Sequence, residues 1–282
     1  MSTNEGLPSF DRPPVIEVLA SVQFDPPVGF NAVHFGLLWS RFRGDFPDIE
    51  QKAPLPQVLE RLGVNPQPQQ IQVEFSTEPA LPRLWFISRS GDELIQVQPD
   101  RFIRNWRAVP TLGNAYPRYH DCIRPRFSAD YTAFVGLLET ERVGTIEPNQ
   151  CELSYINHIV PNEHWSSHRD LASVLRCLSN EFCELLDYPT EAVNMASAHI
   201  INDGSGEFLG RLHIKVQSAF REPQTAGEKQ IPVFVLSLTA RGRPTAKGVE
   251  GVMGFLDIGH RAIVNSFDQV TTPEMHKVWG KR

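Results

Sequence analysis

Residues 209–218 read Leu-Gly-Arg-Leu-His-Ile-Lys-Val-Gln-Ser, and their pattern indicates the fold class. Leu212, Ile214 and Val216 alternate with polar side chains, so apolar and polar residues would point to opposite faces of an extended chain. Such a strand is typical of an antiparallel sheet that is covered on one side only. The turn sequence Asp203-Gly204-Ser205-Gly206 precedes it and predicts a hairpin with the strand before.

The sequence as a whole predicts an α+β protein, with a mostly antiparallel sheet and helices packed on one face. Helices are expected where apolar residues recur three and four positions apart. A loop is expected at 47–70, which is rich in Pro and Gln. The predicted strands are 15–24, 71–76, 83–89, 93–98 with a continuation to 106, 151–160, 192–201, 207–218 and 231–241. The predicted helices are 35–46, 117–140 with a break at Pro125, 171–186, 249–270 and a short helix after Thr272-Pro273.

Both halves of the chain show the same order of elements, β-α-β-β-β-α. Glu17 lies nine residues before Pro26 and Glu152 nine before Pro161, which is an offset of 135. The apolar stripe 35, 38, 39, 42, 46 returns at 171, 174, 175, 178, 182, an offset of 136. We therefore predict two similar halves, 13–145 and 146–282, after a flexible N-terminus, 1–12. The junction between such halves favours a binding site.

The composition is that of a folded globular protein. The 282 residues are 41% hydrophobic and 21% charged. No apolar run reaches the roughly 18–20 residues that span a bilayer, and the start lacks the layout of a signal peptide. Four cysteines without a CxxC pair fit a reducing compartment, so we expect a cytoplasmic protein without membrane contact. The net charge of −6 argues against nucleic acid as a partner.

Arginine is concentrated in 101–126, where six arginines face one acidic residue. On a strand, Arg101 and Arg107 would share one face, and Arg104 and Trp106 the other. Guanidinium groups beside an indole suit a phosphate, a carboxylate or a stacked base. The alternative is structural, with Arg104 paired to an acid and Trp106 packed. The candidate ligand-binding residues are Arg101, Arg104, Trp106, Arg107, Arg124, Arg126 and His260.

His260 lies within the apolar stripe of the last long helix. A buried histidine with a hydrogen-bond partner is the ordinary interpretation, and acid–base chemistry or ligand contact is the alternative. Glu17 and Glu152 occupy matched positions and would either approach each other as paired carboxylates or take separate partners. A third cluster is expected on the polar face of the second half, where it would suit an anion or nucleic acid; the alternative is an ordinary solvated sheet face. Its members are His199, Arg211, His213, Lys215 and Arg241.

The sequence contains no phosphate-binding glycine loop, no nucleophile elbow, no HExxH and no paired CxxC. His164 and His168 have the spacing of two metal ligands but lack a third. The glycines at 248–254 lie in an apolar helical pattern and indicate close packing. We therefore assign no catalytic residue, no metal ligand and no cofactor.

Four segments together resemble a sporadically distributed, uncharacterised family of bacterial proteins over nearly the whole chain. The resemblance implies no activity and transfers no functional residue. The segments are Pro13-Pro14-Val15-Ile16-Glu17, Leu153-Ser154-Tyr155-Ile156-Asn157, Arg104-Asn105-Trp106, and the ending His260…Ile263…Phe267…Thr271-Thr272…Met275-His276…Trp279-Gly280.

These observations lead to three main hypotheses, with nucleic-acid binding as a fourth that the acidic balance makes weaker. The first is a non-enzymatic cytosolic adaptor, an antitoxin- or immunity-like protein of a defence system that binds a protein partner or itself. The second is a sensor of a small anionic or nucleotide ligand, bound through the arginine–tryptophan residues. The third is an enzyme of unknown class that uses His260 as acid or base.

Overall fold

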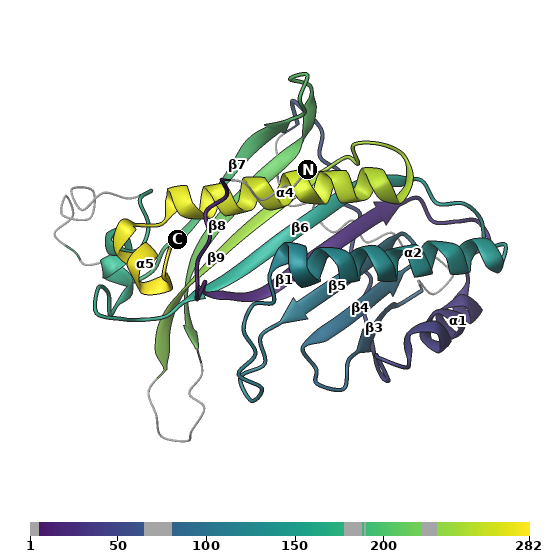
Figure 1. Ribbon diagram of the computed structural model, residues 1–282, viewed down its shortest axis with the longest axis horizontal. Coiled ribbons are helices and arrows are strands. Elements are labelled where there is room, and N and C mark those ends of the chain that lie inside the picture. Colours follow the sequence, from purple (N-terminus) through teal and green to yellow (C-terminus); the bar gives the residue numbers. More distant parts are fainter. Residues whose placement is uncertain (1–5, 65–80, 178–187, 189, 222–229) are drawn as a thin grey trace.

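The strands of the described residues form one sheet, in the order β2-β3-β4-β5-β1-β6-β9-β8-β7, with every neighbour antiparallel (Figure 1). The computed structural model describes residues 6–64, 81–177, 188, 190–221 and 230–282. This confirms the α+β prediction and its antiparallel sheet. The strands are β1 Val15–Phe24, β2 Asp48–Lys52, β3 Arg83–Ile87, β4 Glu93–Gln98, β5 Arg101–Arg107, β6 Pro148–Ile159, β7 Asn194–Asn202, β8 Phe208–Arg221 and β9 Ile231–Gly242.

The first strands of the two predicted halves, β1 and β6, pair at the middle of the sheet. On one side of this pair the order is β5, β4, β3, β2, and on the other it is β9, β8, β7. Leu19 pairs with Ser154, which lies 135 residues later. The strand order is thus compatible with a duplication, and the duplication itself stays a prediction.

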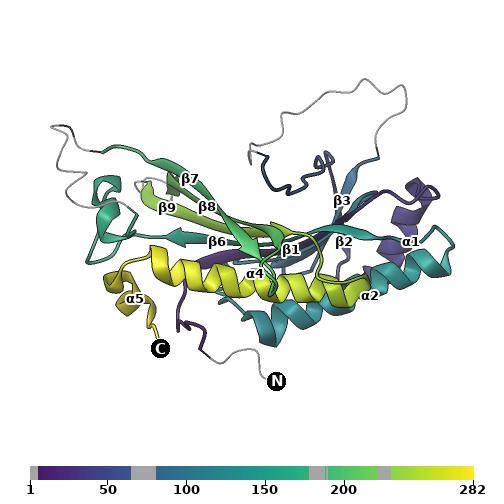
Figure 2. The same ribbon diagram turned by 90° about the horizontal axis from the view of Figure 1, so that it is seen from above.

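The helices cover one face of the sheet (Figure 2). The helix α4 (Gly248–Val270) packs on β6 and β9, and α2 (Arg124–Thr140) lies beside it. The stripe predicted from Phe35 forms α1 (Ala32–Phe42), which packs against β3. The short helix α5 (Pro273–Trp279) begins at Thr272, whose side chain accepts a hydrogen bond from Met275 N, as the Thr-Pro sequence predicts. None of the described helices has the length and apolarity that crossing a membrane requires.

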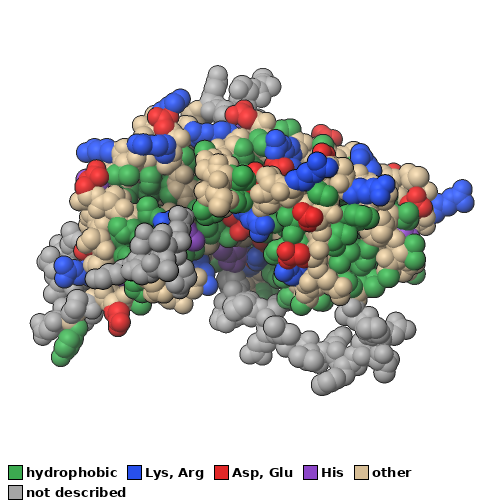
Figure 3. All heavy atoms as spheres, turned by 90° about the horizontal axis from the view of Figure 1, so that it is seen from below, with side chains coloured by type: hydrophobic (Ala, Val, Ile, Leu, Met, Phe, Trp, Pro, Cys, Tyr) green, Lys and Arg blue, Asp and Glu red, His purple; other side chains and the backbone are tan. Residues whose placement is uncertain are grey.

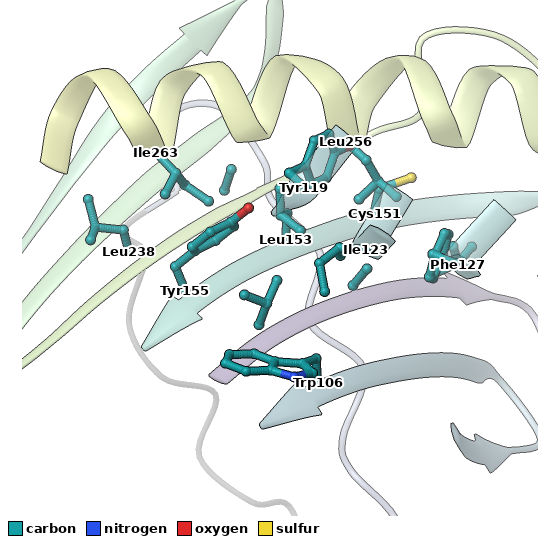
Figure 4. Packing of buried hydrophobic residues seen from close by; sticks show 14 of the residues in the cluster. Trp106, Tyr119, Ile123, Phe127, Cys151, Leu153, Tyr155, Leu238, Leu256 and Ile263 are labelled. Atoms are coloured by element: carbon teal, nitrogen blue, oxygen red, sulfur yellow. The ribbon is translucent and has the colours of Figure 1, made fainter. Parts of the chain in front are cut away.

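A continuous hydrophobic core fills the space between the helix layer and the sheet. Leu153 of β6 and Leu256 of α4 are at most 1% exposed, and Figure 4 shows them with Tyr155 and Tyr119 beneath α4. The alternation in β8 has the expected effect, since Leu212 and Val216 are buried in this core. The polar side chains that alternate with Leu212 and Val216 on β8 lie on the opposite face of the sheet. Residues 53–64 cross this face and lie away from α2 and α4 in Figure 2.

The predicted helix from Leu171 is wrong within the described residues. His168–Ser173 form a 3-10 helix, and Leu175 makes an isolated bridge to Thr271. The reason is competition for backbone carbonyls: Thr272 donates from its hydroxyl to Ser173 O and from its amide to Val174 O. These acceptors are therefore unavailable to a helical ladder. The part of this prediction at 178–186 lies outside the described residues.

Two strands differ from the sequence-based assignment. The strand β2 lies inside the predicted loop; it is an edge strand whose side chains are mostly exposed, so it carries no apolar alternation. The strand β5 is separate from β4, because Gln98 pairs with Arg101 and Pro99-Asp100 forms the turn between them. The predicted strand at 71–76 lies outside the described residues.

The N-terminal segment is held by the C-terminus, although we predicted that 1–12 would be flexible. Asp11 N donates to Gly280 O, and Arg282 N donates to Ser9 O. Phe10 is 4% exposed and packs edge-on against Phe267 at 5.3 Å. The two ends of the described chain therefore close one side of the core. Residues 1–5 lie outside the described residues.

Candidate functional site

A cavity of about 330 Å³ lies on the helix side of the sheet and is lined by residues from both predicted halves. Its walls come from the first half, from β6, β9 and α4 of the second half, and from both chain ends. The lining residues used below are Arg118, Tyr116, Tyr119, His120, Tyr155, Asn157 and His260. This cavity contains His260, the only one of our candidate ligand-binding residues that lines it.

Three side chains form a hydrogen-bonded chain in this cavity. The hydroxyls of Tyr116 and Tyr155 are 2.9 Å apart, and the Tyr155 hydroxyl is 3.0 Å from His260 Nδ1. Tyr155 faces the helix layer because it alternates with outward-pointing residues on β6, and His260 lies on the inner stripe of α4. Donation can run in either direction along these contacts, so the chain has two proton arrangements with the same heavy-atom positions.

Burial keeps this chain uncharged. It raises the pKa of Tyr155 well above its ordinary value and raises that of Tyr116 as well. It also lowers the pKa of His260 to about 3, helped by His120 and opposed by the nearby carboxylate of Asp257. At neutral pH the histidine is therefore a neutral imidazole and the tyrosines are phenols.

A second group of contacts fixes the wall of the cavity to α4. The Tyr119 ring stacks on His260, with centroids 4.0 Å apart and planes 12° apart. The Tyr119 hydroxyl donates to Asp257 at 3.0 Å, and Arg124 donates twice to the same carboxylate, at 2.8 and 2.9 Å. The start of α2 is thereby joined to α4.

The wall itself has an unusual backbone. Tyr119–Ile123 form a π-helix that leads into α2, and Pro125 occupies the first turn of α2, where it needs no backbone donor. Arg118 precedes the π-helix with φ at 67°, a conformation that is costly for a residue other than glycine. Single-turn π-helices and strained residues are enriched at functional sites.

Three polar groups of the cavity have bonding capacity that the described residues leave unused. Asn157 is 1% exposed and donates from Nδ2 to Leu236 O at 3.0 Å, while its Oδ1 has no partner. His120 Nε2 is also buried without a partner. The Arg118 guanidinium contacts Asp11 O at 3.4 Å and the Tyr116 ring, and no described carboxylate pairs with it. Buried polar atoms are nearly always satisfied, so Asn157 Oδ1 and His120 Nε2 offer hydrogen-bonding positions to a molecule in the cavity, and the half-buried Arg118 offers a cation.

The structure does not assemble the expected arginine–tryptophan site. On β5, Arg104 and Trp106 face the helix layer, whereas Arg101 and Arg107 face the opposite side. Arg104 donates to Asp130 at 2.6 Å and to Glu93 at 3.1 Å. This is the structural alternative that the sequence left open.

The other candidate arginines also have partners. Arg126 pairs with Glu93, and Arg124 pairs with Asp257. Arg107 donates to Gly91 O at 2.6 Å, and Arg101 donates to Gln23 and to Pro56 O. None of these guanidinium groups lines the cavity that contains His260.

One residue of the cluster expected on the polar face of the second half, His199, lies elsewhere. Arg211, His213 and Arg241 converge on Glu60. His199 instead pairs across the strands with Leu212 and so lies on the helix side. In an antiparallel pair, directly opposed residues share a face, which the single-strand pattern could not reveal.

Glu17 and Glu152 do not form a carboxylate pair. Glu152 lies opposite Ser21, four positions along β1 from Glu17. Asn105 donates to Glu17 at 2.6 Å, and Arg241 donates to Glu152 at 2.6 Å. Each glutamate has its own partner, which is the second of the two interpretations given above. Among the described residues there is no group of three or more side chains that could hold a metal ion.

The sequence singled out His260, which lines this cavity, but not the other lining residues named above. Tyr116 and Tyr119 come from one segment and Asn157 from another, and none belongs to a motif with a known spacing. The resemblance segments contained Tyr155 and Asn157, but as family markers without a role. Comparison of the chain with models of known protein families gives no match, and comparison with curated proteins gives none either.

Proposed function

We propose that this protein binds a small organic anion in the cavity between its two halves and acts as a ligand-binding protein. The observation that carries the proposal is Asn157 Oδ1, a buried acceptor without a partner in the cavity. A molecule with an N–H or O–H donor would satisfy it, and leaving it unmet is costly.

The other residues that line the cavity indicate which further chemical groups the ligand would carry. Arg118, without a carboxylate partner among the described residues, suits a carboxylate or phosphate group. Leu238, Ile263 and Phe267 offer apolar walls for a ring or a short hydrocarbon body. A volume of about 330 Å³ lies at the lower end of the range for small-molecule sites.

The protonation states favour binding over catalysis. General acid–base catalysis works best when the pKa of the catalytic group lies near the working pH. Burial lowers the pKa of His260 to about 3 and raises that of Tyr155, so neither exchanges a proton readily near neutrality. The Tyr155–His260 pair is better suited to orient a ligand.

Thermal unfolding with added ligand tests the proposal. The probes are 4-hydroxybenzoate and adenosine monophosphate, each with an anionic group, a ring and a donor, and neutral methyl 4-hydroxybenzoate as comparison. We expect at least one anionic probe to raise Tm in a concentration-dependent way, and the ester to have a smaller effect. Arg118→Gln should abolish the difference between acid and ester.

Arg142→Gln is the matched control, since Arg142 also has a positive φ, 55°, but is exposed outside the cavity. It should leave the response unchanged. Absence of a Tm rise with both anionic probes, or an equal response in Arg118→Gln, would overturn the proposal.

A further inference from the structure

The face of the sheet opposite the helices holds a segment of the chain's own backbone. Gln98, Arg101, Gln23 and Gln150 form one row across β4, β5, β1 and β6, because each pairs with the next in the strand register. Residues 55–60 run along this row. Four neighbouring strands thus present their side chains to one crossing segment.

The glutamines bind main-chain groups of this segment. Gln98 accepts from Leu55 N and donates to Leu55 O, both at 2.9 Å. Gln23 does the same to Val58, at 2.9 and 3.0 Å. Gln150 accepts from Glu60 N at 2.9 Å. Side-chain amides thereby replace the peptide groups that a neighbouring strand would offer, so this recognition does not depend on the side chains of the bound segment.

Arg101 completes the row. It donates to Pro56 O at 2.7 Å and to Gln23 Oε1 at 2.6 Å. It is 7% exposed and therefore fixed in position. Its second contact orients the carboxamide of Gln23 toward the crossing segment. Arg101 and the three glutamines thus hold the crossing backbone together.

One side chain of the segment is recognised specifically. Glu60 Oε2 accepts from Arg211 at 2.5 Å, and Oε1 contacts His213 at 2.6 Å and Arg241 at 3.3 Å. Its side chain is 5% exposed. Burial alone would raise the pKa of Glu60, but the bonds from His213 and Arg211 outweigh it and lower the pKa to about 2.

Two arginines of the sheet favour an acid at this place. Arg241 also pairs with Glu152, so the two arginines and Glu152 leave one positive charge for Glu60 to neutralise. An uncompensated buried charge is unfavourable. By contrast, the apolar side chains that follow contribute little burial, since Leu62 is 61% and Val64 57% exposed. Leu55, Val58 and Leu59 are half-buried, so the segment is held by its backbone groups, by one carboxylate and by partial burial of these three side chains.

We propose that this face is a binding site for an extended acidic peptide segment of another protein, and that residues 55–60 occupy it as an internal stand-in. The recognised peptide would have two residues, at the places of Leu55 and Val58, that are each bound through the backbone N–H and the backbone carbonyl. A glutamate or aspartate would follow two positions after the residue at the place of Val58. A partner with this pattern displaces the internal segment. This site is separate from the cavity and does not depend on its ligand.

Peptide binding to the full chain tests the proposal. The probe is a fluorescein-labelled peptide with the sequence of residues 53–64, measured by fluorescence anisotropy. The wild type should bind it weakly because its own segment competes. Glu60→Gln should bind it at least tenfold more tightly, since the internal segment has lost its charged anchor while the site is intact. The same peptide with glutamine at the place of Glu60 should bind at least tenfold less.

Two variants separate this site from the cavity. Glu60→Gln combined with Arg211→Gln should lose the gain in affinity, whereas Glu60→Gln combined with Arg118→Gln should keep it. Equal binding by wild type and Glu60→Gln, or equal binding of the two peptides, would overturn the proposal. Failure of the small-anion probes with success here would leave this site standing.

A second measurement covers the case in which Glu60→Gln does not fold. Trypsin cleaves after Arg61, which directly follows Glu60. An unlabelled peptide with glutamine at the place of Arg61 resists trypsin and should speed cleavage of the wild-type protein after Arg61 several-fold, by displacing the internal segment. An unchanged cleavage rate at saturating peptide would contradict displacement.

Discussion

The Tyr155 hydroxyl on β6 lies 3.0 Å from Nδ1 of His260 on α4, and this bond connects the middle of the sheet to the longest described helix. The two residues are 105 positions apart in the sequence. Tyr116 continues the chain from the first half at 2.9 Å. Both halves thus share one buried polar network, which lies in the same cavity as the unpartnered Asn157 Oδ1.

Removing the central hydroxyl should destabilise the protein. Tyr155→Phe leaves the Tyr116 hydroxyl and His260 Nδ1 without their common partner, and we expect the free energy of unfolding to fall by about 1–3 kcal/mol. Urea unfolding monitored by circular dichroism measures this. The exposed Tyr188→Phe is the control and should change stability by less than about 0.5 kcal/mol.

A double-mutant cycle with His260→Gln isolates the bond between the two residues. Because they touch, the two changes should not add, and the coupling should reach about 0.5–3 kcal/mol. Additive losses would show that Tyr155 and His260 stabilise the fold independently.

Stability should rise with pH between about 3 and 6.5 because of His260. Burial lowers its pKa in the folded protein to about 3, against an ordinary value of 6.5. Between these two pH values the unfolded chain binds a proton that the folded protein does not. The contribution of His260 to the free energy of unfolding is therefore fully present above pH 6.5 and is lost as the pH falls toward 3. One proton corresponds to a slope of up to about 1.4 kcal/mol per pH unit.

The comparison with His260→Gln identifies the source of this slope. The pKa values of His158 and His276 are also lowered by burial and act in the same direction. Glu60, with a pKa of about 2 against 4.5, contributes only below about pH 4.5. The variant should therefore have a shallower slope between pH 5 and 6.5. An unchanged slope would mean that His260 titrates normally.

The glycines of α4 should be far less tolerant than a glycine of α2. A Cβ on Gly251 would lie 1.7 Å from Ala246 O, so the chain entering α4 would have to move. At Gly136 of α2 a Cβ meets nothing within 4 Å. We expect Gly251→Ala to destabilise by about 1–3 kcal/mol and Gly136→Ala to stabilise by about 0.5–1 kcal/mol. Thermal unfolding of both variants measures these changes. An increase in stability from Gly251→Ala would mean that the close contact between Gly251 and Ala246 is absent in solution.

The sequence predicted elements well where one local pattern decides them. The alternation of Leu212 and Val216, the Thr-Pro start of α5 and the apolar stripe of α4 each have a local physical cause, and each is confirmed. The prediction from Leu171 failed because the same apolar spacing fits a 3-10 helix whose carbonyls accept from Thr272, nearly 100 residues later. A hydrogen-bond partner so distant in the sequence cannot be detected from the apolar pattern of a short stretch of residues.

The candidate site was less predictable for a related reason. His260 stood out because a histidine within an apolar stripe is unusual. Tyr116 and Asn157 become candidate site residues only through strand pairing in the sheet and packing under α4, which the sequence does not show. The arginines were conspicuous in the sequence but are paired with acids from other segments, such as Arg104 with Asp130 and Arg124 with Asp257. Local charge sums do not contain these long-range pairs.

The acceptor on Asn157 should make binding selective for ligands with a donor. Benzoate and 4-hydroxybenzoate differ by one hydroxyl. Only the hydroxyl can satisfy Asn157 Oδ1, so the wild type should bind 4-hydroxybenzoate more tightly by a factor on the order of 10. Asn157→Leu removes the acceptor, and the two affinities should then become nearly equal. Titration calorimetry gives both affinities.

Asn149→Leu is a demanding control for this selectivity. Asn149 lies on the same strand, β6, and its Oδ1 is likewise buried without a partner among the described residues, but it lies outside the cavity. It should keep the preference for the hydroxyl, because removing an unpaired oxygen elsewhere on β6 does not alter the ligand's partner. If Asn149→Leu and Asn157→Leu changed the selectivity equally, the effect would come from the strand as a whole. The cavity would then not be the place where the donor of the ligand is recognised.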